Sequence, residues 1–552
     1  MKKRTLALRI AVACGLAMAM VVPAQGADTA STLITLTAPS DIKGVAPLPY
    51  TAVKAAAFTT PETTVNLEVT PQQGFVGSAF SVIGKGLTPN KQMTLVWSTN
   101  EGTWVTDVQP NTINYMGVKY SKFYVNMATV TTDATGGFTF KTKAPSDFGG
   151  VHDIYAIVDG AAVAHGGYQM LRTVSISPKS GPIGTPITIT YTGMGASLYT
   201  AGGSVLYDNQ FAGEMQALWT RGTGKAVIRA SGDVGKHVIY VLDGIGIPYL
   251  NIIQSPVPFA NGDVQTFTVT KDAGAPAPYL VYPDKVTPTV TQKTTLSSIG
   301  LDPDTKAIAT LSKEEGPVFT KVKLDVKGLT TTGLHTIEWA TVVGNRVNCT
   351  GTCWVYNAVP MGTVDVTSAN FNKEIQIPDH LGGWHVVQVK KNGVIEAQVP
   401  FYVQESIMPY YDSKGKVISM GLAKADPSGL PESRNGSGVP TNKFKVGEEF
   451  TIAIKGVGWT QLDNTLAVTY DNSYIGYGCG FNSNGYMVVH LKATGKPGTH
   501  IIDLWPLMYT NQPSFAGTPY GMLPILTADR DFPGLALGYQ LPSIHFAITV
   551  TK

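Results

Sequence analysis

The chain has 552 residues, of which 41 are basic and 38 acidic, and only 14% are charged. Four of the basic residues lie in the first nine positions; without them 37 basic groups face 38 acidic ones, a net charge of −1. Because a phosphate-binding surface needs a basic excess, this balance argues against a nucleic-acid partner. The length exceeds what one hydrophobic core organises and predicts about four domains.

Residues 1–26 have the parts of a secretory signal peptide. Basic residues at positions 2–4 precede an apolar run from Leu6 to Val22, and small residues place the expected cleavage before Ala27. No later apolar run is long enough for a transmembrane helix. The abundance of Gly (59) and Pro (35) is typical of turn-rich extracellular β-proteins. We therefore expect an exported protein, located in the periplasm, at the cell surface or outside the cell.

Two sequence motifs each occur twice. Residues 145–152 (PSDFGGVH) return as 378–385 (PDHLGGWH), and residues 205–213 (VLYDNQFAG) return as 468–476 (VTYDNSYIG). A Gly-x-His follows the second motif at the same distance in both copies, thirty residues from its tyrosine. The order along the chain is A, B, A, B, which indicates a tandem duplication of a two-module unit.

Each module contains runs of alternating apolar and polar residues between glycines and prolines, as in Phe450–Ile454. This period of two predicts strands with one buried face. The fold class that we predict is all-β, with four tandem immunoglobulin-like β-sandwich domains. The predicted boundaries are 27–62 (N-terminal extension), 63–171 (A1), 172–272 (B1), 273–304 (linker or extra strands), 305–405 (A2), 406–440 (linker) and 441–552 (B2, with a long insertion at 506–540).

The start of module B1 resembles a known domain family. Ser175-Ile176-Ser177-Pro178, followed by Gly181 to Thr185 and by Gly193-Met194-Gly195, is similar to the opening of an IPT/TIG-type immunoglobulin-like domain. The resemblance implies a bacterial multi-domain exported protein with this fold. It implies no particular function, because such domains occur in receptors, enzymes and surface proteins.

Two kinds of residue recur once in each module and are predicted to be structural. A core aromatic residue sits on the third long strand, and an inward-facing histidine follows it in a Gly-x-His. Because the modules are separate, the histidines are not expected to surround one metal ion. Hairpin turns are predicted at Asp159-Gly160, Asp243-Gly244 and Asn392-Gly393. The structural residues are Trp97, Tyr207, Trp339, Tyr470, His152, His237, His385 and His500.

Three cysteines remain after the signal peptide is removed. Cys349 and Cys353 flank a three-residue turn, which in an oxidising compartment predicts a small disulfide and leaves Cys479 free. Zinc is the poorer interpretation, since the spacing is not Cys-x-x-Cys and no fourth ligand is evident.

We expect no enzyme activity and no cofactor or metal, because the chain has no His-Glu-x-x-His, no Gly-x-Ser-x-Gly and no Walker A loop. Asp302 with Asp304, and Asp529 with Asp531, offer carboxylates that could hold calcium at a domain junction. Solvated turns are the favoured interpretation of both pairs.

Aromatic side chains suggest a binding surface, because exposed rings stack on sugars or anchor protein partners. The alternative is that the insertion folds back and buries them. The candidates are Trp384, Trp505, Tyr509, Phe515 and Tyr520. We expect a structural or adhesive protein that binds a protein or polysaccharide partner at the cell surface. The alternatives are a carbohydrate-binding or carbohydrate-active protein, and a subunit of a surface layer or filament, which would be a homo-polymer.

Overall fold

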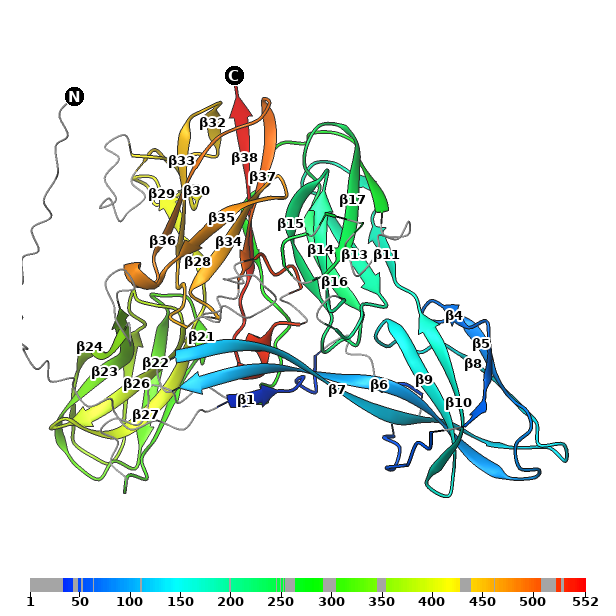
Figure 1. The fold of residues 1–552 in the computed structure, drawn as a ribbon. Helices are drawn as coiled ribbons and strands as arrows, with labels where there is room; N and C mark the ends of the chain where they lie inside the picture. The colour runs from blue at the N-terminus through cyan, green and yellow to red at the C-terminus, as the bar shows by residue number, and fades with distance from the viewer. Residues whose placement is uncertain are drawn as a thin grey trace, which may run out of the picture. The chain divides into compact units, whose positions relative to one another are not determined.

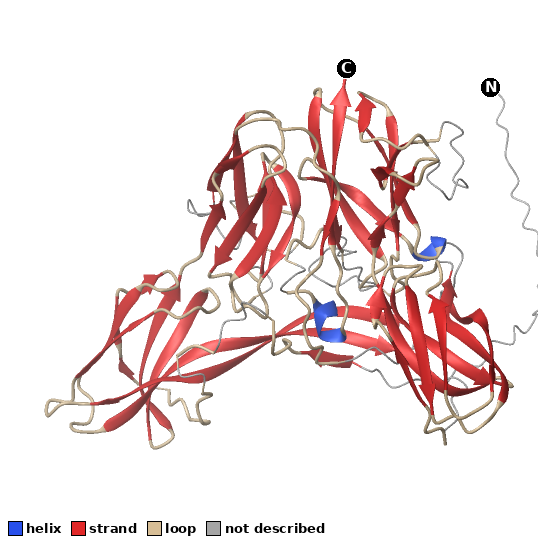
Figure 2. Cartoon of the chain, turned by 180° about the vertical axis from the view of Figure 1, so that it is seen from behind, coloured by secondary structure: helices blue, strands red, loops and turns tan. Residues whose placement is uncertain are grey.

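A computed structural model gives the fold. It describes residues 33–42, 48–50, 53–62, 64–109, 112–197, 200–244, 246–248, 250–251, 253, 264–290, 304–344, 354–426, 438–460, 462–507, 523–527 and 531–552. Leu33–Lys552 forms one compact unit. The regular structure in the described residues is β-strand, apart from the short 3-10 helices η2 (Phe481–Ser483) and η3 (Pro533–Leu537) (Figure 2). The predicted all-β class is confirmed, while the signal peptide and its cleavage site lie outside the described residues.

Repeat A1 consists of two sheets. One has the order β3-β5-β8, and the other has β9 between β6 and β10, with β7 and β1 also paired to β6 (Figure 1). The ribbon of β6 and β7 is the longest hairpin among the described residues. The strands are β1 (Leu33–Leu36), β2 (Val65–Asn66), β3 (Glu68–Thr70), β4 (Gln73–Gly74), β5 (Ala79–Gly84), β6 (Gln92–Gln109), β7 (Thr112–Thr131), β8 (Phe138–Lys143), β9 (Gly150–Val158) and β10 (Ala161–Met170).

Repeat B1 has a three-stranded sheet, β11-β13-β16, and a five-stranded sheet, β12-β18-β17-β14-β15. Its strands are β11 (Thr173–Ser177), β12 (Ser180–Gly181), β13 (Pro186–Thr192), β14 (Gly202–Tyr207), β15 (Gln210–Gln216), β16 (Gly224–Arg229), β17 (Gly235–Asp243) and β18 (Val264–Val269).

Repeat A2 repeats the same strand order, with β20-β22-β25 in one sheet and β21-β27-β26-β23-β24 in the other. Its strands are β20 (Ile308–Leu311), β21 (Glu315–Gly316), β22 (Lys321–Lys327), β23 (Gly333–Gly344), β24 (Trp354–Val366), β25 (Phe371–Gln376), β26 (Gly383–Lys391) and β27 (Val394–Val403).

Repeat B2 takes in more of the chain than predicted. β33 pairs with β28, β31 and β36, and the second sheet runs β19-β38-β37-β34-β35, with β32 also on β38. The strands are β19 (Tyr279–Val281), β28 (Ser406–Ile407), β29 (Pro409–Tyr411), β30 (Val417–Met420), β31 (Leu422–Lys424), β32 (Lys443–Lys445), β33 (Glu449–Lys455), β34 (Thr465–Tyr470), β35 (Ser473–Cys479), β36 (Met487–Lys492), β37 (Gly498–Pro506) and β38 (Ser543–Thr551).

These pairings correct two predicted linkers. The prediction of a linker at 406–440 is wrong, because its strands β28 and β31 complete the sheet of B2 on β33. Of the alternatives for 273–304, extra strands are found, because β19 pairs antiparallel with β38. The N-terminal extension is also partly strand, since β1 pairs with Trp104–Asp107 of β6. The division into four domains with an A-B-A-B relation remains a prediction, supported by the recurring strand order.

The alternation of buried and exposed side chains along the strands shows where the core lies. In β22 the side chains of Val322, Leu324 and Val326 are buried, whereas Lys321 and Lys323, which alternate with them, are exposed. The buried residues of β22 join Trp339 and others from the five-stranded sheet in one cluster, so the two sheets of A2 pack face to face. Clusters of the same kind lie in A1, B1 and B2.

Two of the three predicted hairpin turns are present. Asp159-Gly160 joins β9 to β10 and Asn392-Gly393 joins β26 to β27, with positive φ at all four residues, as a type I′ turn requires. The turn predicted at Asp243-Gly244 is wrong, because β17 ends at Asp243 and β18 begins only at Val264. A local Asx-Gly signal does not reveal how far away the next strand starts.

The repeated Gly-Gly motif forms the joint between an A repeat and the following B repeat. In the first joint the Gly149 amide donates to the Met194 carbonyl at 2.9 Å; in the second, Gly382 donates to Val457 at 2.9 Å. A Cβ on Gly149 would lie 1.8 Å from the carbonyl oxygen of Gly193, and one on Gly382 would lie 1.7 Å from that of Gly456. Backbone approaches backbone so closely that neither position has room for a side chain.

We predict that Gly149→Ala and Gly382→Ala each destabilise the protein by roughly 1–3 kcal/mol or more, because the added methyl overlaps a backbone oxygen that cannot move alone. Denaturant unfolding of each variant measures the loss. Gly167→Ala is the matched control, since its Cβ would meet nothing closer than 3.6 Å. Equal stability of all three variants would contradict the proposed close packing.

Candidate functional site: buried polar contacts within and between the repeats

The Gly-x-His histidines of the A repeats lie against their tryptophans. His152 stacks on Trp97 with ring centroids 4.3 Å apart, and His385 on Trp339 at 4.8 Å. His152 has Nδ1 2.7 Å from the Ser98 carbonyl oxygen and Nε2 2.7 Å from that of Phe148. The corresponding distances for His385 are 3.1 Å to Ala340 and 3.0 Å to Gly382. Each ring therefore ties strands of its own repeat together at the joint.

The histidines of the B repeats use a different partner. The ring nitrogen Nδ1 of His237 lies 2.5 Å from Asp208, and that of His500 lies 2.6 Å from Asp471. Burial lowers the pKa of His500, but the hydrogen bond and charge of Asp471 outweigh burial and raise it overall. The other nitrogens of the two rings lie 2.7 and 2.8 Å from backbone carbonyls.

Sequence reasoning missed the two aspartates that hold these histidines. Asp208 and Asp471 open the positive-φ turns between β14 and β15 and between β34 and β35. Their second carboxylate oxygens accept from the amides of Val238 and Ile501 at 2.8 and 2.9 Å. The available signal was the Tyr-Asp-Asn motif itself, since Asx residues between apolar runs are typical of hairpin turns.

The predicted core aromatics occupy equivalent strands, β6, β14, β23 and β34. Trp97, Trp339 and Tyr207 are buried, and Tyr470 is half-buried. The hydroxyls of the two tyrosines donate to backbone carbonyls 24 residues further along the chain, each at 2.8 Å. The Trp97 indole donates to Asp147 at 2.9 Å, whereas the Trp339 indole has no acceptor among the described residues.

The predicted aromatic binding surface is not found among the described residues. Trp505 is only 3% exposed and belongs to the core cluster that also contains B1 residues, so its assignment to an exposed surface is wrong. Trp384 is half-buried, and its indole donates to the Gly538 carbonyl at 3.2 Å. For these two residues the alternative of burial by the insertion holds. Tyr509, Phe515 and Tyr520 lie outside the described residues.

The predicted Cys349–Cys353 disulfide also lies outside the described residues. Cys479, predicted to be free, is an exposed free thiol. Asp302 and Asp529 are not described either. Asp304 is exposed, but Asp531 is 1% exposed, so the interpretation of its turn as solvated is wrong.

Asp531 is held by three N–H donors from two other repeats. The Trp104 indole of β6 donates to Oδ1 at 3.2 Å, and the amides of Leu218 and Trp219 donate to Oδ2. Burial raises the pKa of Asp531 to about 7, although all three donors act to lower it. The carboxylate thus joins the long A1 hairpin, B1 and the end of the B2 insertion.

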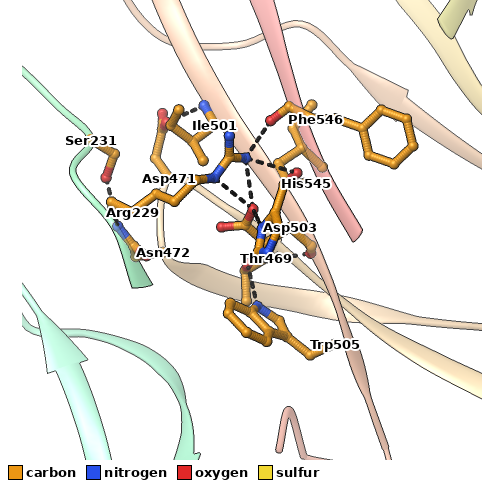
Figure 3. A network of polar contacts seen from close by, with 11 residues as sticks. Arg229, Ser231, Thr469, Asp471, Asn472, Ile501, Asp503, Trp505, His545 and Phe546 are labelled. Carbon is orange, nitrogen blue, oxygen red and sulfur yellow. Dashed lines mark hydrogen bonds and ion pairs between the residues drawn. The ribbon is translucent and has the colours of Figure 1, made fainter. Parts of the chain in front are cut away.

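A buried ionic network joins B1 to B2 (Figure 3). Arg229, at the end of β16, reaches Asp503 of β37 through Nε at 2.9 Å and through a terminal nitrogen at 2.6 Å. The same guanidinium donates to the carbonyls of Ile502 and Phe546. His545 of β38 places Nδ1 2.7 Å from the same Asp503 oxygen, Oδ1.

The backbone around Arg229 is fixed from the other side as well. The side-chain amide of Asn472, in the β34–β35 turn, donates to the Arg229 carbonyl and to the Ser231 hydroxyl, each at 2.8 Å (Figure 3). Burial alone would raise the pKa of Asp503, but the charges of Arg229 and His545 lower it overall. The arrangement is chemically suited to fixing two repeats against each other, because its charges are paired and buried.

The comparisons with known proteins give no family. No family model and no curated protein of known function matches the chain. Among solved structures, E. coli alpha-2-macroglobulin is 8% identical with a TM-score of 0.16; the match covers 87% of this chain and 30% of that one. A putative membrane anchored protein from Corynebacterium diphtheriae is 11% identical with a TM-score of 0.14, covering 61% and 89%. The Yersinia pseudotuberculosis adhesin InvE is 11% identical with a TM-score of 0.13, covering 58% and 97%.

At these identities and TM-scores the similarities carry no functional conclusion. The chain spans less than a third of the alpha-2-macroglobulin that it matches. In the described part of the chain, no helix has the length and apolar character of a membrane span.

We predict that Arg229→Met lowers the free energy of unfolding by roughly 3–5 kcal/mol, because Asp503 would stay buried without its guanidinium. Arg229→Met combined with Asp503→Leu should cost less than Arg229→Met alone. Denaturant unfolding measures both. Lys496→Met is the control, because its ion pair with Asp233 is 79% and 68% exposed, so that solvent screens it and its loss should change the stability little. An Arg229 variant as stable as the Lys496 variant would refute the role of the network.

His385 predicts a loss of stability in acid. Burial lowers its pKa to about 4 in the folded protein, whereas the unfolded chain takes up the proton near 6.5. Stability should therefore fall as the pH drops from 6.5 towards 4, by on the order of 3 kcal/mol from this residue. The free energy of unfolding of the native protein and of His385→Gln, measured at a series of pH values, gives the contribution of this residue. Parallel pH profiles for the two proteins would contradict it.

Proposed function

We propose that the chain is an exported, non-enzymatic protein of the cell surface or periplasm, with a structural or adhesive role and a protein or polysaccharide partner. Its repeats would be bacterial immunoglobulin-like modules of the IPT/TIG type. The observation that carries the proposal is the set of joints. The histidines, the Arg229 network and Asp531 are all engaged in holding strands and repeats together, which suits a stiff element that presents loops to a partner.

One connection offers a contact surface. Between β17 and β18, the side chains of Ile247, Leu250 and Ile253 are 69%, 70% and 92% exposed. The sequence from Gly244 to Gly262 contains no charged residue. Exposed apolar side chains close together in the chain are typical of binding surfaces and are costly to leave in water. They support an adhesive role for B1.

The test is binding by the purified protein, residues 27–552, to intact cells of its source and to their isolated cell-wall polysaccharide. We expect saturable binding that falls at least tenfold when Ile247, Leu250 and Ile253 are all replaced by Asp. The matched control replaces Val151, Val234 and Ile308, which are 68%, 63% and 65% exposed, and should bind as the native protein does.

Other outcomes would favour the alternatives. Steady release of soluble sugar from the polysaccharide would indicate a carbohydrate-active protein and contradict the non-enzymatic proposal. Ordered filaments or sheets of the purified protein in electron micrographs would indicate a surface-layer or filament subunit. Equal loss of binding in both triple variants would contradict the assignment of the contact surface.

A further inference from the structure

Two carboxylates lie buried at the joint between A2 and B2. Glu405 follows β27 and is 5% exposed; Asp463 precedes β34 and is 2% exposed. Both oxygens of Glu405 and Oδ2 of Asp463 have no hydrogen-bond partner among the described residues. The same is true of two neighbouring buried groups, the side-chain nitrogen of Asn464 and the hydroxyl of Tyr539.

These groups belong to one region. A Cβ on Gly383 would lie 2.4 Å from Asp463 Oδ2 and 3.5 Å from the Tyr539 ring, so both face the same backbone position. Glu405 and Asp463 also pack against one short segment, residues 456–458: a Cβ on Gly456 would lie 3.3 Å from the Cα of Glu405, and a Cβ on Gly458 would lie 2.0 Å from the Cγ of Asp463. After the larger effect of burial, the charge of Asp463 raises the pKa of Glu405. Asp463 itself is oriented by the amide and hydroxyl of Thr460, both of which donate to Oδ1 and leave Oδ2 open.

Comparison with the A1–B1 joint shows how the A2–B2 joint differs. Gly193 and Gly456 occupy equivalent places. A Cβ on Gly193 would lie 2.5 Å from the carbonyl oxygen of Leu171, and a Cβ on Gly456 would lie 2.5 Å from that of Gln404. Arg172 and Glu405 are therefore equivalent. In the first joint Arg172 forms an ion pair with the buried Asp243. At the backbone position that carries Arg172 in the first joint, the second joint carries an acidic residue, Glu405.

At a second position, too, the second joint has an acidic residue that the first joint lacks. The Gly195 amide donates to the Thr200 carbonyl at 2.8 Å, and the Gly458 amide donates to the Asp463 carbonyl at 2.9 Å, so Thr200 and Asp463 are equivalent. The first joint holds a balanced Arg–Asp pair, whereas the second holds two acidic side chains that form no ion pair with any described residue. A carboxylate left buried and unpaired is strongly unfavourable, so the second joint needs a source of positive charge.

Protonation of the two carboxylates alone is a poor source of this positive charge. Burial raises the pKa of Asp463 to about 7 and that of Glu405 well above its usual value. Each bound proton, however, turns an oxygen into a donor that needs an acceptor of its own. A divalent cation neutralises two carboxylates without introducing a new donor. Calcium fits best, because it binds carboxylates in one- or two-oxygen modes and tolerates irregular geometry, whereas magnesium demands near-ideal octahedra and retains water.

We propose that the joint between A2 and B2 is a calcium site in which Glu405 and Asp463 are the carboxylate ligands. The ion replaces, in the second copy of the duplicated joint, the guanidinium that Arg172 provides in the first. Calcium would thereby stiffen the connection between the two C-terminal repeats. The proposal does not depend on the adhesive role, because the site is defined by the joint itself.

The test uses the full mature chain after dialysis against EDTA. We expect equilibrium dialysis with calcium to give one ion per chain, and millimolar CaCl2 to raise the Tm by several degrees, while MgCl2 at the same concentration does not. Glu405→Gln and Asp463→Asn should each bind calcium at least tenfold more weakly and lose the Tm shift. Glu374→Gln, whose side chain is 71% exposed, is the control and should respond as the native protein does.

Three results would overturn the site. The first is no bound calcium in the native protein. The second is an unchanged calcium shift in Asp463→Asn, or an equal shift with magnesium. The third is a Tm that in EDTA rises on acidification from pH 8 to pH 5 to that of Asp463→Asn, with no further gain from calcium, which would show that protons alone stabilise the pair. Because Asp463→Asn keeps the Thr460 contacts through Oδ1, loss of folding is not expected to obscure the comparison.

Discussion

The structure depends on backbone contacts that leave no room for a side chain. At both A–B joints a glycine amide donates to a carbonyl of the next repeat, and a neighbouring glycine carbonyl lies where a Cβ would have to be. Backbone contacts of this kind are insensitive to the identity of the surrounding side chains. The two joints can therefore share one backbone geometry while the residues around them differ.

The residues around the two joints differ in a consistent way. Asp147 accepts the Trp97 indole in the first joint, but its counterpart in the second is His380, and the Trp339 indole lacks an acceptor among the described residues. The ring of His380 instead lies 3.1 Å from the Thr341 hydroxyl, and burial lowers its pKa. With Arg172 and Thr200 matched by Glu405 and Asp463, the two joints share a scaffold but differ in charge. Equal backbone geometry therefore does not imply equal chemistry.

Much of the fold could be predicted because the signals that specify its strands and turns lie within short stretches of the sequence. Alternation located the long strands, and the fixed spacing from Tyr207 to His237 reflects two intervening strands, β15 and β16, which correspond to β35 and β36 in B2. The pairing of β19 with β38, and of β28 and β31 with β33, could not be predicted, since strands of two or three residues carry no periodicity. The burial of Asp531 was missed for another reason. The donors that hold its carboxylate come from two other repeats, so nothing near it in the sequence marks it as buried.

The two B repeats also differ in the connection between their last two strands. In B2 this segment returns to B1, where the amide of Glu214 in β15 donates to the Pro524 carbonyl at 2.8 Å and the Glu214 carbonyl accepts from the Leu526 amide at 2.9 Å. The insertion thus extends a sheet of B1, and Asp531 follows it into contact with Trp104. In B1 the described residues of the equivalent connection instead expose apolar side chains to solvent. Because both segments connect the last two strands of a repeat, the difference lies in their sequences: the B2 segment pairs with a strand of B1, whereas the described part of the B1 segment leaves apolar side chains in solvent.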